Sequence, residues 1–370
     1  MTAGHAFAEG IIRWQAQFGR HDLPWQGTHD PYRIWLSEVM LQQTQVRTVI
    51  PYYLRFLDRF PDVAALAAAP LDRVMELWSG LGYYSRARNL HRCAQSVVRE
   101  HEGHFPDSAA ALAELPGIGP STAAAIAAFA FGERSAILDG NVKRLLCRHF
   151  GVTGWPGERP VEQRLWAIAR RELPERDIER YTQGLMDLGA QTCVRSRPRC
   201  DGCPVAASCV ARIEARQSLL PKARPPRATP VREAGWLVIL NDDAVLLERR
   251  PPAGIWGGLL SFPEVEPGER ERERAAEAAA ARFGVAPVRV SALAPVYHAF
   301  THFRLIAYPM LIEVGRGGAL AGESQARWVA RATAGEQALP QPVRGLLEQL
   351  SQPRGPDPAP RKRRNPTDRG

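Results

Sequence analysis

The sequence predicts two domains of different class, an all-α domain followed by a smaller α+β domain. Apolar residues recur with a helical period in the first part, and no alternating strand pattern occurs before residue 230. Residues 212–232 are rich in proline and arginine and show no periodicity, so we interpret them as a linker. Strand patterns then begin at residue 235.

Composition and charge narrow the class of protein. The 370 residues are 45% apolar and 8% aromatic, which are globular values, and this length favours two domains. We expect neither a membrane span nor export, because no run of about 18 apolar residues and no basic-then-apolar leader occurs. The net charge is +9, and most of the excess lies in segment 212–232 and in the tail, 351–370. Nucleic acid is the natural partner of such charge, although a merely soluble linker would look the same.

Hydrophobic periodicity and local helix signals place the elements in order. We expect a first domain over 1–211 with helices at 6–18, 32–50, 52–60, 63–68, 71–78, 89–100, 108–114, 122–131, from about 142, 161–172 and 178–188. The second domain, 233–350, should have strands at 235–240, 244–248, near 288, 293–297, 303–312 and 326–329, with helices at 271–283 and 342–350. The Pro- and Arg-rich tail should be disordered.

A glycine hairpin joins two of the expected helices. Gly117 and Gly119 permit a tight backbone path, and Pro120 suits the first turn of the next helix. The backbone N–H groups of such a turn can bind a phosphate. On its own, however, this pattern would more often be a helix-packing turn. Asp139 lies further on, just ahead of a helix that begins near Val142.

Glu38 is a carboxylate within an apolar helical stretch. Burial without a partner would raise its pKa and keep it protonated, as a general acid near neutral pH requires. The alternative is that Glu38 lies on a polar stripe with Gln42 and Gln45.

A second loop, 79–88, combines glycines, two tyrosines and two arginines. Tyr83 could enter a base stack, and Arg86 and Arg88 could meet phosphates. Core packing is the alternative for one of the tyrosines.

Four cysteines close the first domain, at Cys193, Cys200, Cys203 and Cys209. Without an export signal, the spacing C-x6-C-x2-C-x5-C indicates a metal site, either zinc or a 4Fe–4S cluster. The compact and uneven spacing favours iron–sulfur. The arginines at 195, 197 and 199 would then lie on a loop suited to phosphate, while Cys93 and Cys147 are expected in the core.

Together these motifs resemble the adenine DNA glycosylases (the MutY family) of the helix-hairpin-helix superfamily, over about residues 5–350. They are LPWQ at 23–26, WLSEVMLQQTQV at 35–46, GLGYYSRARNL at 80–90, LPGIGPSTA at 115–123, LDGNVKR at 138–144, MDLGA at 186–190 and the four-cysteine loop. The resemblance implies that Glu38 protonates adenine N7 and later activates water. It also implies that Asp139 stabilises an oxocarbenium-like sugar and that Asn141 helps to hold the site.

The resemblance also assigns contacts with DNA and a cofactor. Gln43 and Tyr83 are implied to insert into the base stack, and Trp25 and Gln183 to line the base pocket. The backbone at Gly117 and Gly119 is implied to contact phosphate. The four cysteines are implied to hold a 4Fe–4S cluster. Bifunctional relatives similar to endonuclease III have a catalytic lysine after the hairpin, whereas this chain has Ser121 at that position. We expect Ser121 to contact DNA. Lys143 is the one lysine of residues 1–211, so we expect a monofunctional glycosylase with at most a slow lyase step through Lys143.

The second domain resembles a Nudix fold whose hydrolase site has been lost. Its helix carries alanines and Arg282 where that family places magnesium-binding glutamates. In the adenine glycosylases this domain reads 8-oxoguanine, and Phe300, Thr301 and His302 are similar to the reading loop. A plain turn is the alternative.

The leading hypothesis is therefore the removal of adenine opposite 8-oxoguanine, or more slowly opposite G, from double-stranded DNA. We expect a monomer in the bacterial cytoplasm, associated with the nucleoid. The alternatives are an endonuclease III-like enzyme for oxidised pyrimidines, a non-catalytic DNA-binding protein and a nucleotide hydrolase. Ser121 and the second domain argue against the first alternative, the pair Glu38 and Asp139 against the second, and the depleted Nudix helix against the third.

Overall fold

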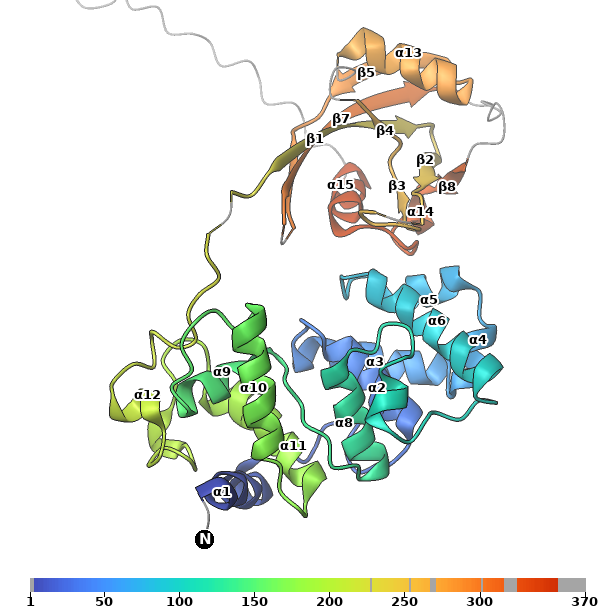
Figure 1. Ribbon diagram of the computed structural model, residues 1–370. Coiled ribbons are helices and arrows are strands. Elements are labelled where there is room, and N and C mark those ends of the chain that lie inside the picture. Colours follow the sequence, from blue (N-terminus) through green and yellow to red (C-terminus); the bar gives the residue numbers. More distant parts are fainter. Residues whose placement is uncertain are drawn as a thin grey trace, which may run out of the picture. The chain divides into compact units, whose positions relative to one another are not determined.

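The computed structural model describes residues 3–226, 228–252, 254–266, 271–300, 302–315 and 325–351, which form two compact units divided between Ala228 and Thr229 (Figure 1). Every described strand belongs to the second unit, and the first unit is built of helices. The predicted fold class is confirmed: an all-helical domain precedes a Nudix-like domain with a mixed sheet.

The helical unit follows the predicted order of elements. Its helices are α1 (Ala3–Phe18), α2 (Pro31–Leu41), α3 (Val46–Arg59), α4 (Val63–Ala68), α5 (Leu71–Trp78), α6 (Ser85–Glu100), α7 (Ala109–Leu112), α8 (Pro120–Phe131), α9 (Gly140–His149), α10 (Arg159–Arg171), α11 (Ile178–Asp187) and α12 (Val210–Ile213), with a π-helical turn η1 (Leu188–Thr192) and a 3-10 turn η2 (Cys200–Gly202).

Helix α8 lies at the centre of this unit. Six consecutive residues, 123–128, are buried, and five of them are alanines. Small side chains let neighbouring helices approach closely, and α8 accordingly packs against α2, α7 and α11. The helix that carries Glu38 and the hairpin that precedes α8 are thereby held against each other.

The prediction of a single helix over 32–50 is wrong, because the chain leaves the helical path after Leu41. Gln43 has a φ of +57°, and α3 begins only at Val46. The reason is tertiary: carbonyls of the last turn of α2 accept hydrogen bonds from the Arg86 side chain, a contact that local sequence does not reveal.

The predicted linker also begins too early. Residues 214–220 still belong to the helical unit, since the carbonyls of Gln217 and Leu220 accept hydrogen bonds from the buried Arg148 and the Leu220 side chain is buried. On the far side of the linker, the first strand already begins at Val231.

The second unit is an eight-stranded sheet covered by helices. Its strands are β1 (Val231–Leu240), β2 (Ala244–Arg249), β3 (Leu260–Ser261), β4 (Glu264–Val265), β5 (Pro287–Ala292), β6 (Val296–Ala299), β7 (Arg304–Val314) and β8 (Ala326–Ala330). Its helices are α13 (Arg272–Phe283), α14 (Arg331–Ala334) and α15 (Gln341–Ser351). Strands β1 and β7 pair in parallel, from Val231 with Arg304 to Leu240 with Glu313, whereas the other described pairs are antiparallel.

Alternation along β1 separates the two cores of the second unit. Trp236 and Val238 belong to a cluster that includes α15, whereas Leu237 and Ile239 belong to the cluster beneath α13. Successive side chains of a strand point to opposite faces, so the sheet lies between α13 and α15 (Figure 1).

A buried ion pair joins the chain after α1 to α11, and its loss should be costly. Asp187 is fully buried and accepts hydrogen bonds from the Arg20 backbone (2.9 Å), the Arg20 guanidinium (2.7 Å) and Gln183 (2.8 Å). Asp187→Ala leaves a partly buried guanidinium without its partner, so we expect the free energy of unfolding to fall by about 3–5 kcal/mol. Urea unfolding followed by far-ultraviolet circular dichroism measures it. Asp58→Ala, at an exposed position, should change it by no more than about 0.5 kcal/mol, and equal midpoints for both variants would contradict the prediction.

Candidate active site and nucleic-acid interface

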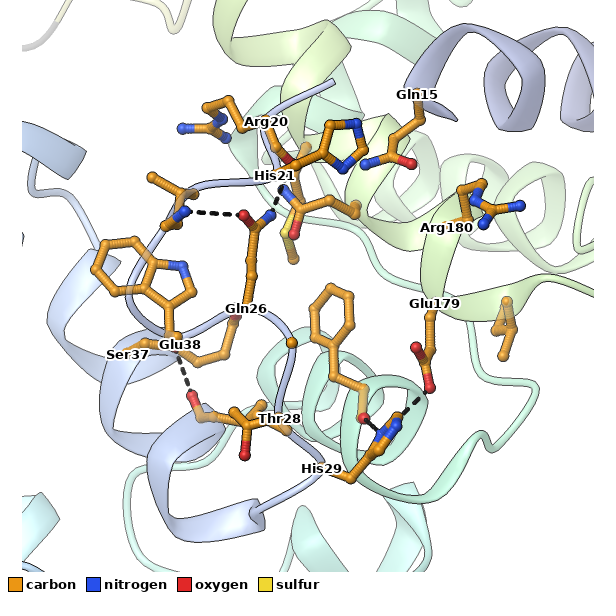
Figure 2. A pocket seen from close by; sticks show the side chains of 18 of the residues that line it. Gln15, Arg20, His21, Gln26, Thr28, His29, Ser37, Glu38, Glu179 and Arg180 are labelled. Atoms are coloured by element: carbon orange, nitrogen blue, oxygen red, sulfur yellow. Dashed lines mark hydrogen bonds and ion pairs between the residues drawn. The ribbon is translucent and has the colours of Figure 1, made fainter. Parts of the chain in front are cut away.

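A cavity of about 720 Å³ opens in the helical unit beside α2 (Figure 2). It is lined by the loop that contains Trp25 and Gln26, by one face of α2, and by the start of α11. Glu38 reaches it from α2 and Gln183 from α11. Trp25 is buried against Tyr53, with ring centroids 5.4 Å apart. Two predicted pocket residues and the predicted acid therefore line one cavity.

Several polar residues of this cavity were not identified from the sequence. Gln26 fixes the loop by accepting from the Leu23 backbone and donating to the Arg20 carbonyl. The His29 imidazole lies 3.4 Å from a Glu179 carboxylate oxygen at another part of the wall. Gln26 and His29 belong to the loop between α1 and α2, and Glu179 belongs to α11; only Gln26, within the LPWQ motif, carried a local signal.

Glu38 is poorly solvated, as its apolar neighbours predict. Burial raises the pKa of its carboxyl to about 8, and the negative charge of Asp139 adds to the increase. The structure therefore brings two carboxyl groups that lie 101 positions apart in the sequence (139 − 38) close enough to interact.

Asp139 caps the N-terminus of α9. Its Oδ1 accepts a hydrogen bond from the Val142 backbone N–H at 2.7 Å. Burial raises the pKa of Asp139, while backbone N–H groups at Val142 and Asn141 and the charges of Arg144 and Lys143 act to lower it. These donors and cations favour the anionic form that burial alone would oppose.

Asn141 lies against the turn η1. Its Oδ1 accepts from Arg144 at 2.9 Å, and a Cβ placed on Gly189 would lie only 2.6 Å from the Asn141 Cβ. Arg144 also donates to the carbonyls of Gly189 (2.6 Å) and Cys193 (2.7 Å). Asn141 thus joins the first turn of α9 to the segment that leads into the cysteine loop.

The hairpin before α8 has the geometry that its glycines suggest. Gly117 has a φ of +81°, and a Cβ there would come within 2.6 Å of the Asn89 Cβ. Gly119 is the N-cap of α8. The Ser121 hydroxyl accepts from the Leu138 N–H at 2.9 Å, so Ser121 fixes the segment that precedes Asp139.

Gln43 and Tyr83 lie in two short loops with left-handed backbones. Their φ angles are +57° and +49°, and both side chains are exposed, Tyr83 by 45%. Arg88 is half-buried near the start of α6.

The expectation that Arg86 meets a DNA phosphate is wrong. Its side chain is only 7% exposed, and its guanidinium donates to protein carbonyls and to a threonine hydroxyl. The donors that a phosphate would use are already engaged inside the protein.

The four cysteines of the spacing motif line one cavity beside α9. Their loop is held by Arg148, which donates to backbone carbonyls at Cys193, Val194 and Arg195. Among the described residues, no three Cys, His, Asp or Glu side chains are arranged to hold a single metal ion. Four thiols that line one cavity match, in number and type, the four thiolates that hold an iron–sulfur cluster. Cys93 and Cys147 are buried core residues, as predicted.

The second unit presents an aromatic group at the end of β6. Phe300 stacks on Phe303 (4.3 Å between centroids) and contacts His298 (4.6 Å) and Trp256 (5.3 Å). His302 is exposed beside them, and Thr301 lies outside the described residues.

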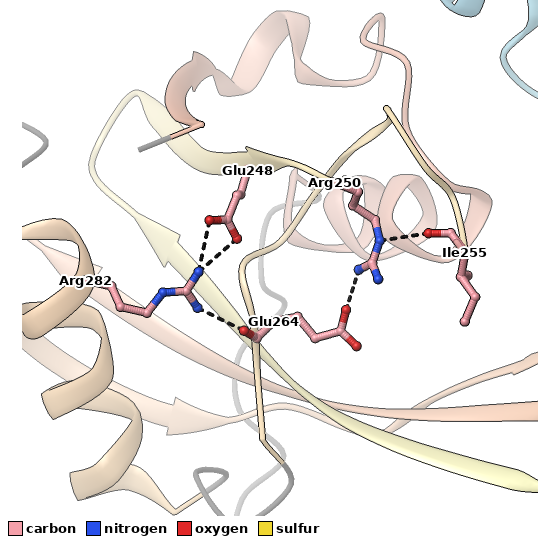
Figure 3. A network of polar contacts seen from close by, with 5 residues as sticks. All are labelled: Glu248, Arg250, Ile255, Glu264 and Arg282. Carbon is pink, nitrogen blue, oxygen red and sulfur yellow. Dashed lines mark hydrogen bonds and ion pairs between the residues drawn. The ribbon is translucent and has the colours of Figure 1, made fainter. Parts of the chain in front are cut away.

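Arg282 occupies the end of α13 and forms a polar network with neighbouring strands (Figure 3). Its guanidinium donates to both carboxylate oxygens of Glu248 at 3.0 Å and to the Glu264 carbonyl at 2.9 Å. Arg250 pairs with the Glu264 carboxylate. A protein cation therefore neutralises Glu248 at this end of the helix.

Comparison with known proteins assigns the chain to a family. Residues 36–171 match the family described as HhH-GPD superfamily base excision DNA repair protein, and residues 235–349 match the NUDIX domain. The adenine DNA glycosylase of Buchnera aphidicola subsp. Acyrthosiphon pisum (strain APS) is 33% identical over 348 residues, which cover 93% of this chain and 97% of that protein. The chain belongs to the adenine DNA glycosylase family.

Two further comparisons agree with this assignment. The adenine DNA glycosylase of Homo sapiens is 35% identical over 358 residues, covering 81% of this chain and 65% of the human protein. The solved structure of a thermostable thymine-DNA glycosylase superposes with a TM-score of 0.51 at 28% identity, covering 56% of this chain and 95% of that one.

Membership makes the chain a base excision repair glycosylase, a hydrolase that acts on N-glycosyl bonds. The cavity that contains Glu38 lies within the helical unit, to which the matched glycosylase region belongs. In the described part of this adenine DNA glycosylase family member, none of the helices has the length and apolar character needed to cross a bilayer.

The raised pKa of Glu38 should appear in the stability of this glycosylase. An unfolded glutamate releases its proton near pH 4.3, whereas the folded chain keeps the Glu38 proton up to about pH 8. The folded state therefore binds more protons between these values, and wild-type stability falls as the pH rises through this window. The glutamine of Glu38→Gln does not ionise. The free energy of unfolding of this variant, relative to that of wild type, should therefore increase from about pH 4.3 to about pH 8 and then stay constant.

Chemical denaturation at a series of pH values measures this difference. Glu9→Gln, at an exposed position of α1, is the matched control and should show no growing difference. A constant difference between Glu38→Gln and wild type across the window would contradict the assignment.

Proposed function

We propose that this glycosylase removes adenine opposite 8-oxoguanine, and more slowly opposite G, and that it is monofunctional. The single observation that carries the catalytic part is the pair of carboxyl groups: Glu38 has a raised pKa in a cavity, and Asp139 interacts with it. Two carboxyl groups in different environments can divide the roles of acid and anion.

The proposed reaction starts when DNA places a flipped adenine in the cavity, because a base within a duplex is out of reach. The protonated Glu38 gives its proton to adenine N7, which turns the base into a better leaving group. The bond between C1′ and N9 breaks, and its electron pair leaves with adenine. Asp139 stabilises the positive charge that remains on the sugar, as the second carboxylate of a glycosidase does. Water adds to C1′ and gives its proton to the Glu38 carboxylate, which restores the acid.

Position 121 is a serine, where bifunctional relatives have a catalytic lysine, and this supports base release without strand cleavage. The Ser121 hydroxyl accepts from the Leu138 N–H, and the Lys143 ammonium is 2.6 Å from a Glu162 carboxylate oxygen. A protonated, ion-paired lysine is a poor nucleophile, so a Schiff base at Lys143 would form slowly.

The proposed DNA contacts follow from the two exposed loops and the hairpin. Gln43 and Tyr83 would enter the base stack on insertion, and the backbone at Gly117 and Gly119 would bind a phosphate. Trp25 and Gln183 would line the base pocket. We propose that one chain acts alone on double-stranded DNA.

We propose that Cys193, Cys200, Cys203 and Cys209 hold a 4Fe–4S cluster. Their common cavity and the Arg148 contacts that fix the loop support it. When bound, the cluster would order the loop that exposes Arg195, Arg197 and Arg199 to a DNA backbone.

We propose that the second unit reads 8-oxoguanine through Phe300, Thr301 and His302. The aromatic group around Phe300 supports the described part of this loop. The ion pair of Arg282 with Glu248 supports a binding role in place of nucleotide hydrolysis, because the carboxylate already has a cation.

Single-turnover assays on two duplexes test the activity. We expect wild type to release adenine opposite 8-oxoguanine, to give strand breaks only after alkali, and to leave thymine glycol opposite A intact. The rate should fall about ten-fold per pH unit above about pH 8, as Glu38 loses its proton. Glu38→Gln should lower the rate at least about 10²–10⁴-fold with DNA binding nearly unchanged. Glu9→Gln should behave as wild type. Breaks at thymine glycol without alkali would instead assign the chain to the endonuclease III-like alternative.

The reading loop makes a separate prediction. The double variant Thr301→Ala, His302→Ala should reduce the ratio of adenine release opposite 8-oxoguanine to release opposite G by about 10-fold or more, since lost hydrogen bonds weaken discrimination. Val288→Ala, at a position 78% exposed on β5, should keep the wild-type ratio. An unchanged ratio in the double variant would show that this loop is not the reader.

A further inference from the structure

The two loops that carry Gln43 and Tyr83 have backbones that need support. A positive φ at a non-glycine residue is unfavourable and persists only where surrounding contacts impose it. Both side chains are exposed, so contacts made by other residues must stabilise the two backbones.

A single buried guanidinium contacts both loops. Arg86 Nη1 donates to the carbonyls of Val39 (2.9 Å) and Met40 (2.7 Å), at the end of α2 where the first loop starts. Arg86 Nη2 donates to Thr44 Oγ1 at 3.0 Å, in the residue that follows Gln43.

The same Nη2 also reaches the second loop. It donates to the carbonyls of Leu81 (3.3 Å) and Gly82 (3.2 Å), in the two residues before Tyr83. The Tyr83 ring lies 5.5 Å from the Arg86 guanidinium carbon, and the Arg86 backbone N–H donates to the Tyr83 carbonyl at 2.8 Å. The guanidinium thus bridges the flanks of both exposed side chains.

This arrangement is costly for a residue that serves only the core. Burial lowers the pKa of Arg86 to about 10, and in the described part of the chain no Asp or Glu forms an ion pair with it. Its Nε also has no acceptor among the described residues. A buried charge that is compensated by carbonyls and a hydroxyl, with no carboxylate, is expensive. The planar guanidinium of Arg86 presents its donors in a rigid arrangement, so it can hold the two loops at a fixed distance from each other.

We propose that Arg86 is a positioning residue that couples the loops of Gln43 and Tyr83, so that both side chains enter the DNA together and extrude the target base. This inference rests on the proposed function, because it assigns the insertion step to these two residues. Arg86 itself touches neither substrate nor the reacting atoms. Loss of its guanidinium should slow extrusion of the base while the cavity around Glu38 stays intact.

The test measures extrusion apart from bond cleavage. The duplex carries 8-oxoguanine opposite a 2′-fluorinated deoxyadenosine, whose glycosidic bond resists cleavage, with fluorescent 2-aminopurine as the neighbouring base. The fluorescence rise after mixing gives the extrusion rate. Arg86→Lys is compared in two backgrounds, wild type and the double variant Gln43→Ala, Tyr83→Ala, and thermal melting reports the folded fraction.

We expect Arg86→Lys to slow extrusion about ten-fold or more in the wild-type background and less than about two-fold in the double variant. Residues that act through one another show such non-additive effects. Arg148→Lys is the matched control, since Arg148 is a buried arginine bound to backbone carbonyls away from both loops. Its effect should be the same factor in both backgrounds.

Two outcomes would overturn the inference, and they are distinguishable. If wild type releases adenine and Arg86→Lys acts by the same factor in both backgrounds, Arg86 is a structural residue only. If wild type releases no adenine opposite 8-oxoguanine, the proposed function fails and this inference fails with it.

Thr44→Val keeps the test decisive if Arg86→Lys does not fold. It removes one acceptor of the guanidinium and keeps the side-chain shape. Extrusion should slow about three-fold in the wild-type background and be unchanged in the double variant. An equal effect in both backgrounds would again overturn the inference.

Discussion

The site depends on the low solvation of two carboxyl groups. Glu38 reaches a cavity from α2 and Asp139 caps α9, so the two come from helices that are separate in sequence, and the charge of Asp139 acts on Glu38. Their surroundings differ in one respect that matters for chemistry. Burial raises the pKa of both groups, but backbone donors and nearby cations act to lower the pKa of Asp139, whereas the Asp139 charge raises the pKa of Glu38 further. Helix α8 links the two, because it packs against α2 and its Ser121 hydroxyl accepts a hydrogen bond from the Leu138 N–H, in the residue before Asp139.

Arginines act inside the helical unit as connectors between irregular segments. Arg86 joins two exposed loops, Arg144 joins the start of α9 to η1, and Arg148 holds the cysteine loop. Each binds backbone carbonyls that no helix or sheet satisfies, and one guanidinium can serve several of them. The number of basic residues in this unit is therefore larger than the number whose charge lies at the surface. Arg195, Arg197 and Arg199, by contrast, are exposed on the cysteine loop.

The second unit has the architecture of the NUDIX domain, with an arginine at the end of its first helix. The sheet and α13 match the NUDIX domain, yet Arg282 lies against Glu248 at the end of that helix. An internal cation of this kind removes the electrostatic demand for a bound metal ion. The aromatic group around Phe300 packs at the end of β6, with Phe300 half-buried between Trp256 and the buried Phe303.

The sequence by itself determined the class of each domain, the order of elements and the family. Helical periodicity, the glycine hairpin and the cysteine spacing are local features, so each could be interpreted without a partner segment. Apolar neighbours made Glu38 a candidate, and the resemblance of the surrounding motif to the glycosylase family decided for it over the polar-stripe alternative. The break after Leu41, the packing of residues 214–220 and the inward position of Arg86 were missed.

These three features share one physical reason. Each depends on a guanidinium that meets carbonyls far away in the chain, and no local pattern encodes which carbonyls those are. The tertiary structure also decided which polar residues line the cavity, since Glu179 lies on α11 whereas Gln26 and His29 lie on the loop before α2. Local sequence determines which residues can form a helix or accept a proton, whereas only packing determines which of them meet.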